Sequence, residues 1–162
     1  MSASPVGQQA PSGEPSADGW VVVGIDGSAG SERALRWAAS TAQARGAELH
    51  VVTSWTFPAI PWGPYQPPLS AQEFAQGAHD VARAEIRSVL GAEGEDAVSL
   101  EVLQGAPSLR LLEYADRAQL LVVGSRGRGG FAGLLLGSVS QHLAEHARCP
   151  VVIVPGARND SE

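Results

Sequence analysis

The sequence predicts an α/β fold, a parallel and doubly wound sheet of five strands with helices on both faces. Five short apolar runs alternate with segments of helical periodicity along the chain. The runs are continuously apolar, which is typical of strands covered on both faces. Right-handed crossovers between parallel strands place the intervening helices on both sides of the sheet.

The first half of the chain supplies two strands, Trp20–Ile25 and Ala47–Ser54. The helix between them is capped by Ser28 or Ser31, since either hydroxyl can accept a hydrogen bond from a free N–H of the first turn. Gly46 ends that helix, because glycine readily adopts the left-handed conformation that follows many helix C-termini.

A proline-rich stretch separates the second strand from the second helix. Residues 55–69 hold five prolines, which exclude both helix and central strand, so we expect a long loop. Ser70-Ala-Gln-Glu73 then forms a capping box, in which the serine and the glutamate each satisfy a free backbone N–H. The helix that follows is predicted to reach about Leu90.

The second half continues the alternation and completes the sheet. One helix begins at Pro107, a residue suited to the first helical turn, and the last helix runs from about residue 137 to 147. The three remaining strands are predicted at Val98–Leu103, Gln119–Val123 and Val151–Val154.

Length and composition bound the class of protein. Residues 1–18 and 157–162 lack periodicity and are expected to be flexible tails, which leaves one domain over residues 19–156. The net charge of -6 argues against nucleic acid as a partner. No run reaches the roughly 20 apolar residues that a membrane helix needs, and no secretory signal is visible. A single cysteine fits a reducing compartment, so we expect a cytoplasmic protein.

All 11 cationic residues are arginines, and this absence of lysine excludes some chemistry. A Walker phosphate loop needs a lysine beside its Ser or Thr, and a Schiff base needs a lysine amine. A dinucleotide fingerprint follows the first strand directly, whereas the glycine-rich segment here follows the fourth. Phosphate contacts must therefore come from backbone N–H groups, hydroxyls and guanidinium groups.

The glycine-rich loop extends from Gly124 to Ser138. Its glycines allow backbone N–H groups to approach an anion closely and to form an anion-binding nest. Gly137 and Ser138 open a helix whose N-terminal amides favour a phosphate, and Ser140 lies within one turn. The alternative is a flexible loop with an ordinary serine cap, and the residues alone leave both interpretations open.

Ligands of doubly wound sheets bind beyond the carboxyl ends of the strands, where the strand order reverses. The first strand ends at Asp26 and the fourth at Gly124, so these residues form one crevice if the two strands are neighbours. Arg126 and Arg128 lie inside the loop, where each can pair with a phosphate or point into solvent. Asp26 can instead close an Asx turn.

The loop has the pattern Gly124-x-x-Gly127, nine residues, then Gly137-Ser138, and it resembles that of ATP-binding universal stress proteins. The likeness covers roughly residues 19–156. It includes an early strand ending in Asp26, His50-Val51 on the second strand, Gly105-x-Pro107, and Cys149-Pro150 before the last strand. The non-binding branch of that family replaces the loop glycines, which this chain keeps.

The resemblance implies an adenine nucleotide alpha hydrolase-like fold with strand order 3-2-1-4-5. It implies that Asp26 and the backbone of Val51 flank adenine and ribose, with Gly124 and Gly127 close to the ribose and α-phosphate. It also implies Mg²⁺ or Mn²⁺ bridging the outer phosphates of ATP, and a homodimer paired through Val151–Val154. The outer phosphates would be held by Gly137, Ser138 and Val139, and the candidate binding residues also include Arg126 and Ser140.

His142, Glu145 and His146 match an H-x-x-E-H zinc pattern. A third protein ligand would have to come from the 16 residues after His146, most of them strand and tail. We therefore expect an amphipathic helix here, with no resident metal and no catalytic residue assigned.

These observations predict an ATP-binding regulatory or stress-response protein in which nucleotide occupancy changes conformation or partner choice. A slow ATPase or nucleotide-processing enzyme using the same pocket is one alternative. Phosphoryl transfer needs a positioned base and cations, and the loop offers no lysine and no base except Asp26. A structural dimer module that binds no nucleotide is the other alternative.

Overall fold

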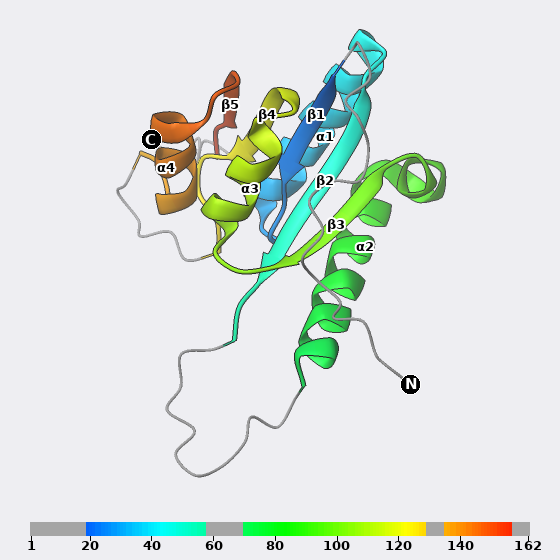
Figure 1. The fold of residues 1–162 in the computed structure, drawn as a ribbon. Helices are drawn as coiled ribbons and strands as arrows, with labels where there is room; N and C mark the ends of the chain where they lie inside the picture. The colour runs from blue at the N-terminus through cyan, green and yellow to red at the C-terminus, as the bar shows by residue number, and fades with distance from the viewer. Residues whose placement is uncertain (1–18, 58–69, 129–134, 157–162) are drawn as a thin grey trace, which may run out of the picture.

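The computed structural model describes residues 19–57, 70–128 and 135–156 of the chain. The predicted tails, 1–18 and 157–162, and most of the predicted proline-rich loop lie outside the described residues. Five strands alternate with four helices (Figure 1). In chain order they are β1 (Trp20–Gly24), α1 (Ala29–Arg45), β2 (Glu48–Trp55), α2 (Ala71–Asp96), β3 (Ser99–Gln104), α3 (Pro107–Ala115), β4 (Ala118–Gly124), α4 (Ser138–His146) and β5 (Val151–Val154).

The five strands form one sheet in the order β3-β2-β1-β4-β5, with every neighbouring pair parallel. This confirms the predicted fold class and strand order. β1 pairs with β2 on one side and with β4 on the other, so the strand order reverses between β1 and β4. The predicted crevice therefore lies at an actual switch point of the sheet.

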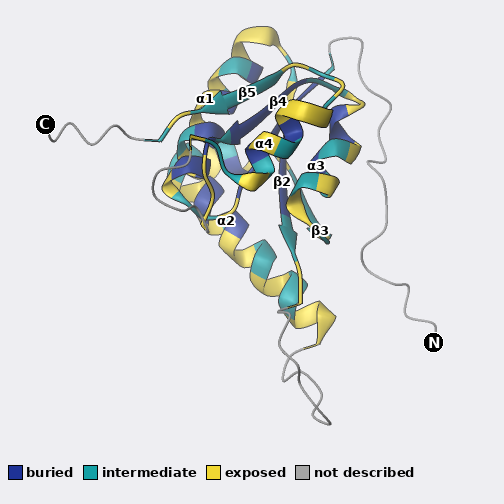
Figure 2. Ribbon diagram, turned by 90° about the vertical axis from the view of Figure 1, so that its left-hand side faces the viewer, coloured by how far each residue is buried: buried dark blue, intermediate teal, exposed yellow. Residues whose placement is uncertain are grey.

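Helices cover the sheet on both faces, with α1 and α2 on one side and α3 and α4 on the other (Figure 1). Successive residues of β1 face opposite layers, and the strand is buried along its whole length. Val21 and Val23 pack against α1, whereas Val22 packs with Leu111 of α3 and Leu143 of α4. Figure 2 shows this arrangement as buried strands between helices whose outer sides are exposed.

The ends of α1 follow from two local features. Ser28 is the N-cap, and its Oγ accepts a hydrogen bond from the backbone N–H of Ser31 at 3.2 Å, so Ser28 rather than Ser31 caps the helix. Gly46 follows the last turn with a φ of 63°, the left-handed conformation predicted from its type.

Helix α2 begins at the predicted capping box and runs past its predicted end. Ser70 Oγ accepts from the N–H of Glu73, and the Glu73 carboxylate accepts from the N–H of Ser70 at 2.7 Å. Gly91 interrupts the helical backbone with a φ of 76°, and a further short piece reaches Asp96. Neither α2 nor any other helix in the described ranges is long and apolar enough to cross a membrane.

Candidate functional site

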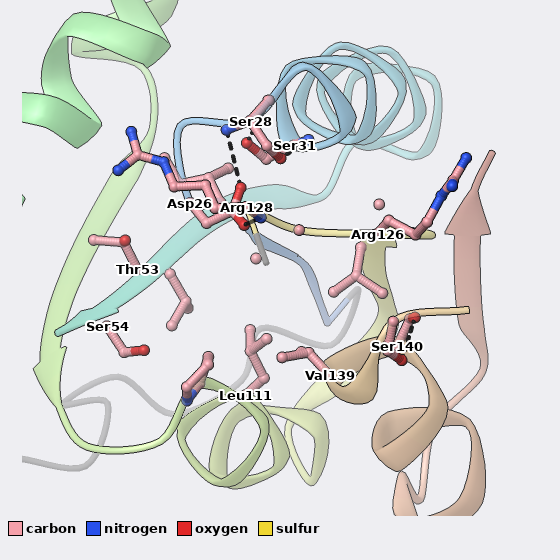
Figure 3. A pocket seen from close by; sticks show the side chains of 18 of the residues that line it. Asp26, Ser28, Ser31, Thr53, Ser54, Leu111, Arg126, Arg128, Val139 and Ser140 are labelled. Atoms are coloured by element: carbon pink, nitrogen blue, oxygen red, sulfur yellow. Dashed lines mark hydrogen bonds between the residues drawn. The ribbon is translucent and has the colours of Figure 1, made fainter. Parts of the chain in front are cut away.

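A cavity of about 430 Å³ opens beyond the carboxyl ends of β1, β2 and β4 (Figure 3). Its size is within the range of small-molecule sites. Eight of the nine predicted binding residues line it, which are Asp26, Gly124, Arg126, Gly127, Gly137, Ser138, Val139 and Ser140.

Val51 is the predicted binding residue that does not line the cavity. It is fully buried in the core between the sheet and α1 and α2. The lining on β2 comes from Val52, Thr53 and Ser54 instead. The register explains why the lining begins at Val52, because Gly24 at the end of β1 pairs with Val52, and β2 continues to Trp55. The role expected for the backbone of Val51 stays a prediction.

Asp26 joins the two loops that border the cavity. Its Oδ1 accepts from the N–H of Ser28 at 3.0 Å, and its Oδ2 accepts from the N–H of Arg128 at 3.1 Å. The first contact is the Asx turn that the sequence left as an alternative, and the second ties the glycine-rich loop to the end of β1. A Cβ on Gly127 would lie 2.5 Å from Oδ2, so glycine is needed for this approach.

Glu85 of α2 supports the same turn from the core side. Its Oε2 accepts from the N–H of Gly27 at 2.8 Å, and its Oε1 accepts from Ser31 Oγ at 2.5 Å. Burial raises the pKa of Glu85, and the two hydrogen bonds offset part of that rise. Sequence reasoning missed this residue, because more than 50 residues separate it from its partners and no local pattern marks it.

The first turn of α4 borders the cavity without a side-chain cap. Gly137 is the N-cap, and among the described residues no side-chain cap hydrogen bond is formed there. Ser138 is exposed at the cavity and does not act as the cap. Ser140 is 2% exposed, and its Oγ lies 2.9 Å from the carbonyl oxygen of Ser125 and 3.0 Å from that of Gly137. Its hydroxyl donates to these carbonyls and fixes the loop onto the helix.

The two arginines of the loop point in opposite directions (Figure 3). The guanidinium group of Arg128 lies against Gly27, and a Cβ on that glycine would lie 2.6 Å from Arg128 Nη2. Arg126 lines the cavity, but its guanidinium group points toward the end of β5. Neither arginine forms an ion pair within the part of the chain that the structure describes.

Apolar side chains complete the wall of the cavity. Leu111 and Val139 point inward from α3 and α4 (Figure 3). Pro107, in the first turn of α3, lines the same wall. The sequence signal for these residues was weak, since an apolar helix position does not reveal which part of the sheet it covers.

The histidines of the zinc-like pattern contact each other. The rings of His142 and His146 stack with centroids 4.2 Å apart, and His146 Nδ1 lies 2.9 Å from the carbonyl oxygen of His142. No group of three or more His, Cys, Asp or Glu able to hold a metal occurs among the described residues.

Burial raises the pKa of the Cys149 thiol, which keeps it protonated at neutral pH.

The sheet order and the cavity at its switch point are those of an adenine nucleotide alpha hydrolase-like fold, which the related solved structures described below share. The model of the universal stress protein family matches residues 20–155. The chain therefore belongs to the universal stress protein family.

Two similar proteins come from mycobacteria. Universal stress protein Rv2623 of Mycobacterium tuberculosis is 34% identical over 139 residues, which cover 82% of this chain and 44% of that protein. A universal stress protein of Mycolicibacterium smegmatis is 40% identical over 139 residues, covering 83% of this chain and 45% of that protein. The chain thus spans less than half the length of these relatives.

Solved structures of the family have the same fold. A universal stress protein crystallised in complex with cAMP has a TM-score of 0.60 and 29% identity, covering 85% of this chain and 98% of that one. A universal stress protein from Archaeoglobus fulgidus has a TM-score of 0.51 and 27% identity, covering 83% and 97%.

Proposed function

We propose that the chain binds ATP in the cavity beyond β1 and β4 and acts as a nucleotide-dependent regulatory or stress-response module. The observation that carries this proposal is the first turn of α4, which borders the cavity without a side-chain cap. The N-terminal amides and dipole of a helix favour phosphate groups. The related universal stress protein in complex with cAMP supports an adenine nucleotide as the ligand.

The rest of the lining suits the other parts of the nucleotide. Leu111, Val123 and Val139 offer apolar contacts for a base. Asp26 offers a carboxylate for ribose hydroxyl groups. Each of its oxygens accepts one backbone N–H, and a carboxylate has about four acceptor positions, so it retains capacity for a ligand.

A divalent cation fits this arrangement through the nucleotide. The described residues contain no cluster of metal-ligating side chains, and a nucleotide-bound Mg²⁺ takes its ligands mainly from phosphates and water. Mg²⁺ or Mn²⁺ would neutralise phosphate charge. The residues of the chain would then orient the phosphates through the amides of the loop and of α4.

Incubation of the purified protein with radiolabelled ATP and Mg²⁺ tests the proposal. We expect ATP to be retained with negligible turnover, because the chain has no lysine and Asp26 is the only candidate base among the described residues that line the cavity. Catalytic turnover that is lost in Gly137→Val would identify an enzyme instead. No retention of nucleotide would contradict both functions and favour a structural dimer module.

Ser138→Ala tests the place of the phosphates. The Ser138 side chain is exposed and does not cap α4, so its removal should leave the free energy of unfolding unchanged. Loss of a hydroxyl that donates to a phosphate should weaken ATP binding about tenfold and leave adenosine binding unchanged. Ser140→Ala is the contrasting variant, since it removes a buried hydroxyl of the same turn and should lower the free energy of unfolding.

We also propose that residues 19–156 act as one cytoplasmic domain that pairs with a second copy through β5. β5 is an edge strand of four half-buried apolar residues, and an exposed edge is a template for pairing with another strand. The single cysteine of the chain suits a reducing compartment.

A further inference from the structure

Two guanidinium groups approach Gly156, just after the end of β5, and one of them belongs to a residue that also lines the nucleotide cavity. Arg33 comes from α1, and Arg126 comes from the loop after β4. A Cβ on Gly156 would lie 3.4 Å from Arg126 Nη2 and 3.8 Å from Arg33 Nη2. The two groups thus border the same small space, which the missing side chain of Gly156 leaves open.

Hydrogen bonds fix the surroundings of this space. Arg33 Nε donates to the carbonyl oxygen of Pro155 at 3.2 Å, which leaves both terminal nitrogens of the guanidinium group for another ligand. The N–H of Gly156 donates to Ser125 Oγ at 3.1 Å, and the N–H of Ser125 donates to the carbonyl oxygen of Val154 at 2.8 Å. The end of β5 is therefore tied to both arginine-bearing elements.

The two charges have no counter-ion within the described residues, although the chain is acidic. Arg33 and Arg126 form no ion pair there, whereas Arg83 and Arg87 both contact Glu95. Acidic residues outnumber arginines by 17 to 11, so a carboxylate beside this pair would be the ordinary arrangement. Two cations held close together repel each other, and an anion between them removes that cost.

We propose that Arg33 and Arg126 form a binding site for a phosphate group in the space beside Gly156. Two guanidinium forks that approach from different elements suit a tetrahedral phosphate, whereas one planar carboxylate is satisfied by a single fork. The site adjoins the nucleotide cavity, because Arg126 Cα would lie 3.4 Å from a Cβ on Gly137. The phosphate is either the terminal group of a nucleotide in that cavity, which rests on the proposed function, or free inorganic phosphate.

Two variants remove this site in independent ways. Arg33→Gln removes one charge, and Arg36→Gln is the matched control, since Arg36 is an exposed arginine of the same helix. Gly156→Val fills the space between the guanidinium groups without changing charge. The φ of Gly156 is outside the left-handed region, so its backbone accepts a side chain.

Calorimetric titrations with ATP, with AMP and with inorganic phosphate distinguish the two sources of the phosphate group. If the group is the terminal phosphate of a nucleotide, Arg33→Gln and Gly156→Val weaken ATP binding about tenfold and leave AMP binding unchanged. If it is free phosphate, the same variants lose inorganic phosphate binding and keep the wild-type affinity for ATP.

One result would overturn the site: Arg33→Gln and Gly156→Val behave like Arg36→Gln with all three probes. Failure of the proposed nucleotide function has a different signature. In that case the wild-type protein binds neither ATP nor AMP, while the inorganic phosphate titration still decides whether the two-arginine site exists.

Discussion

Gly30 and Gly124 touch where the start of α1 meets the end of β4. A Cβ on Gly124 would lie 2.9 Å from the carbonyl carbon of Gly30, and a Cβ on Gly30 would lie 2.8 Å from the carbonyl oxygen of Arg126. Both obstacles are backbone atoms, which cannot rotate away as a side chain can. This contact sets how closely the glycine-rich loop approaches the turn that carries Asp26.

Gly30→Ala should therefore destabilise the protein by about 1–3 kcal/mol, because the added methyl group forces the two backbones apart. Gly77→Ala is the control within α2, since a Cβ there meets nothing within 4 Å. That change should stabilise the protein by about 0.5–1 kcal/mol through helix propensity. Urea denaturation measures both, and equal stability of the two variants would contradict the close contact.

The sequence could predict which segments of the chain border the cavity, because chain position decides this, but it could not predict the direction in which individual residues point. Asp26 and the loop glycines end adjacent parallel strands, so topology alone brings them together. The register of β1 against β2 decides which residues of β2 line the cavity, and no sequence pattern specifies it. The direction of Arg126, toward the end of β5, depends on contacts with residues far along the chain.

At the scale of the element, α2 is stabilised by its capping box at one end and by ion pairs across its kink at the other. The periodicity ends near Leu90, where the first helical piece also ends, because Gly91 leaves the helical conformation. The piece that follows is held by Glu95, whose carboxylate contacts Arg83 at 2.6 Å and Arg87 at 2.5 Å. The spacing of apolar residues gives no sign of these ion pairs, so the sequence predicted only the first part of α2.

Ser70→Ala should loosen the first turn of α2. The change removes the hydroxyl that accepts from the N–H of Glu73. We expect amide hydrogen exchange in the first turn of α2 to become about fivefold faster, in line with the usual effect of losing an N-cap. Exchange in α3, which Ser70 does not touch, is the internal control. Unchanged exchange in α2 would mean that the box contributes nothing to the helix.

Glu85 gives the link between α2 and the turn after β1 a pH dependence. Burial raises its pKa above the ordinary value of 4.5, and nearby Asp26 and Glu32 add to that rise. The folded protein thus binds this proton more readily than the unfolded chain does. The stability that Glu85 contributes is complete below pH 4.5 and is lost as the pH rises through its folded pKa.

Glu85→Gln removes this titration and keeps the size of the side chain. The difference in unfolding free energy, wild type minus variant, should therefore be larger at pH 5 than at pH 7. Chemical denaturation at the two pH values measures it. A difference that shrinks on acidification would show that the folded protein lowers the pKa of Glu85 instead.

At the scale of the whole molecule, the free edge of β5 makes the proposed homodimer testable. The carbonyl oxygen of Pro150 accepts a hydrogen bond from the N–H of Leu121 in β4, and that of Val154 accepts from the N–H of Ser125, just after β4. Because the polar groups of successive strand residues alternate in direction, those of Val151 and Ile153 point away from the sheet. These outward groups are the ones that a second copy would pair with.

Ile153→Pro should convert the dimer to a monomer, because it removes an outward N–H without touching the bonds to β4. Ile153→Ala loses similar packing but keeps that N–H, so it should remain dimeric. Sedimentation equilibrium measures both. A dimeric Ile153→Pro protein of wild-type affinity would place any pairing surface elsewhere.

The contact between Glu85 and Gly27 joins the cavity to the other face of the sheet. The turn that carries Asp26 belongs to the cavity, while the carboxylate that holds it belongs to a helix on the opposite face from α3 and α4. The turn at the cavity and α2 are thus linked through one carboxylate, so a displacement of either changes the hydrogen bonds that hold the other.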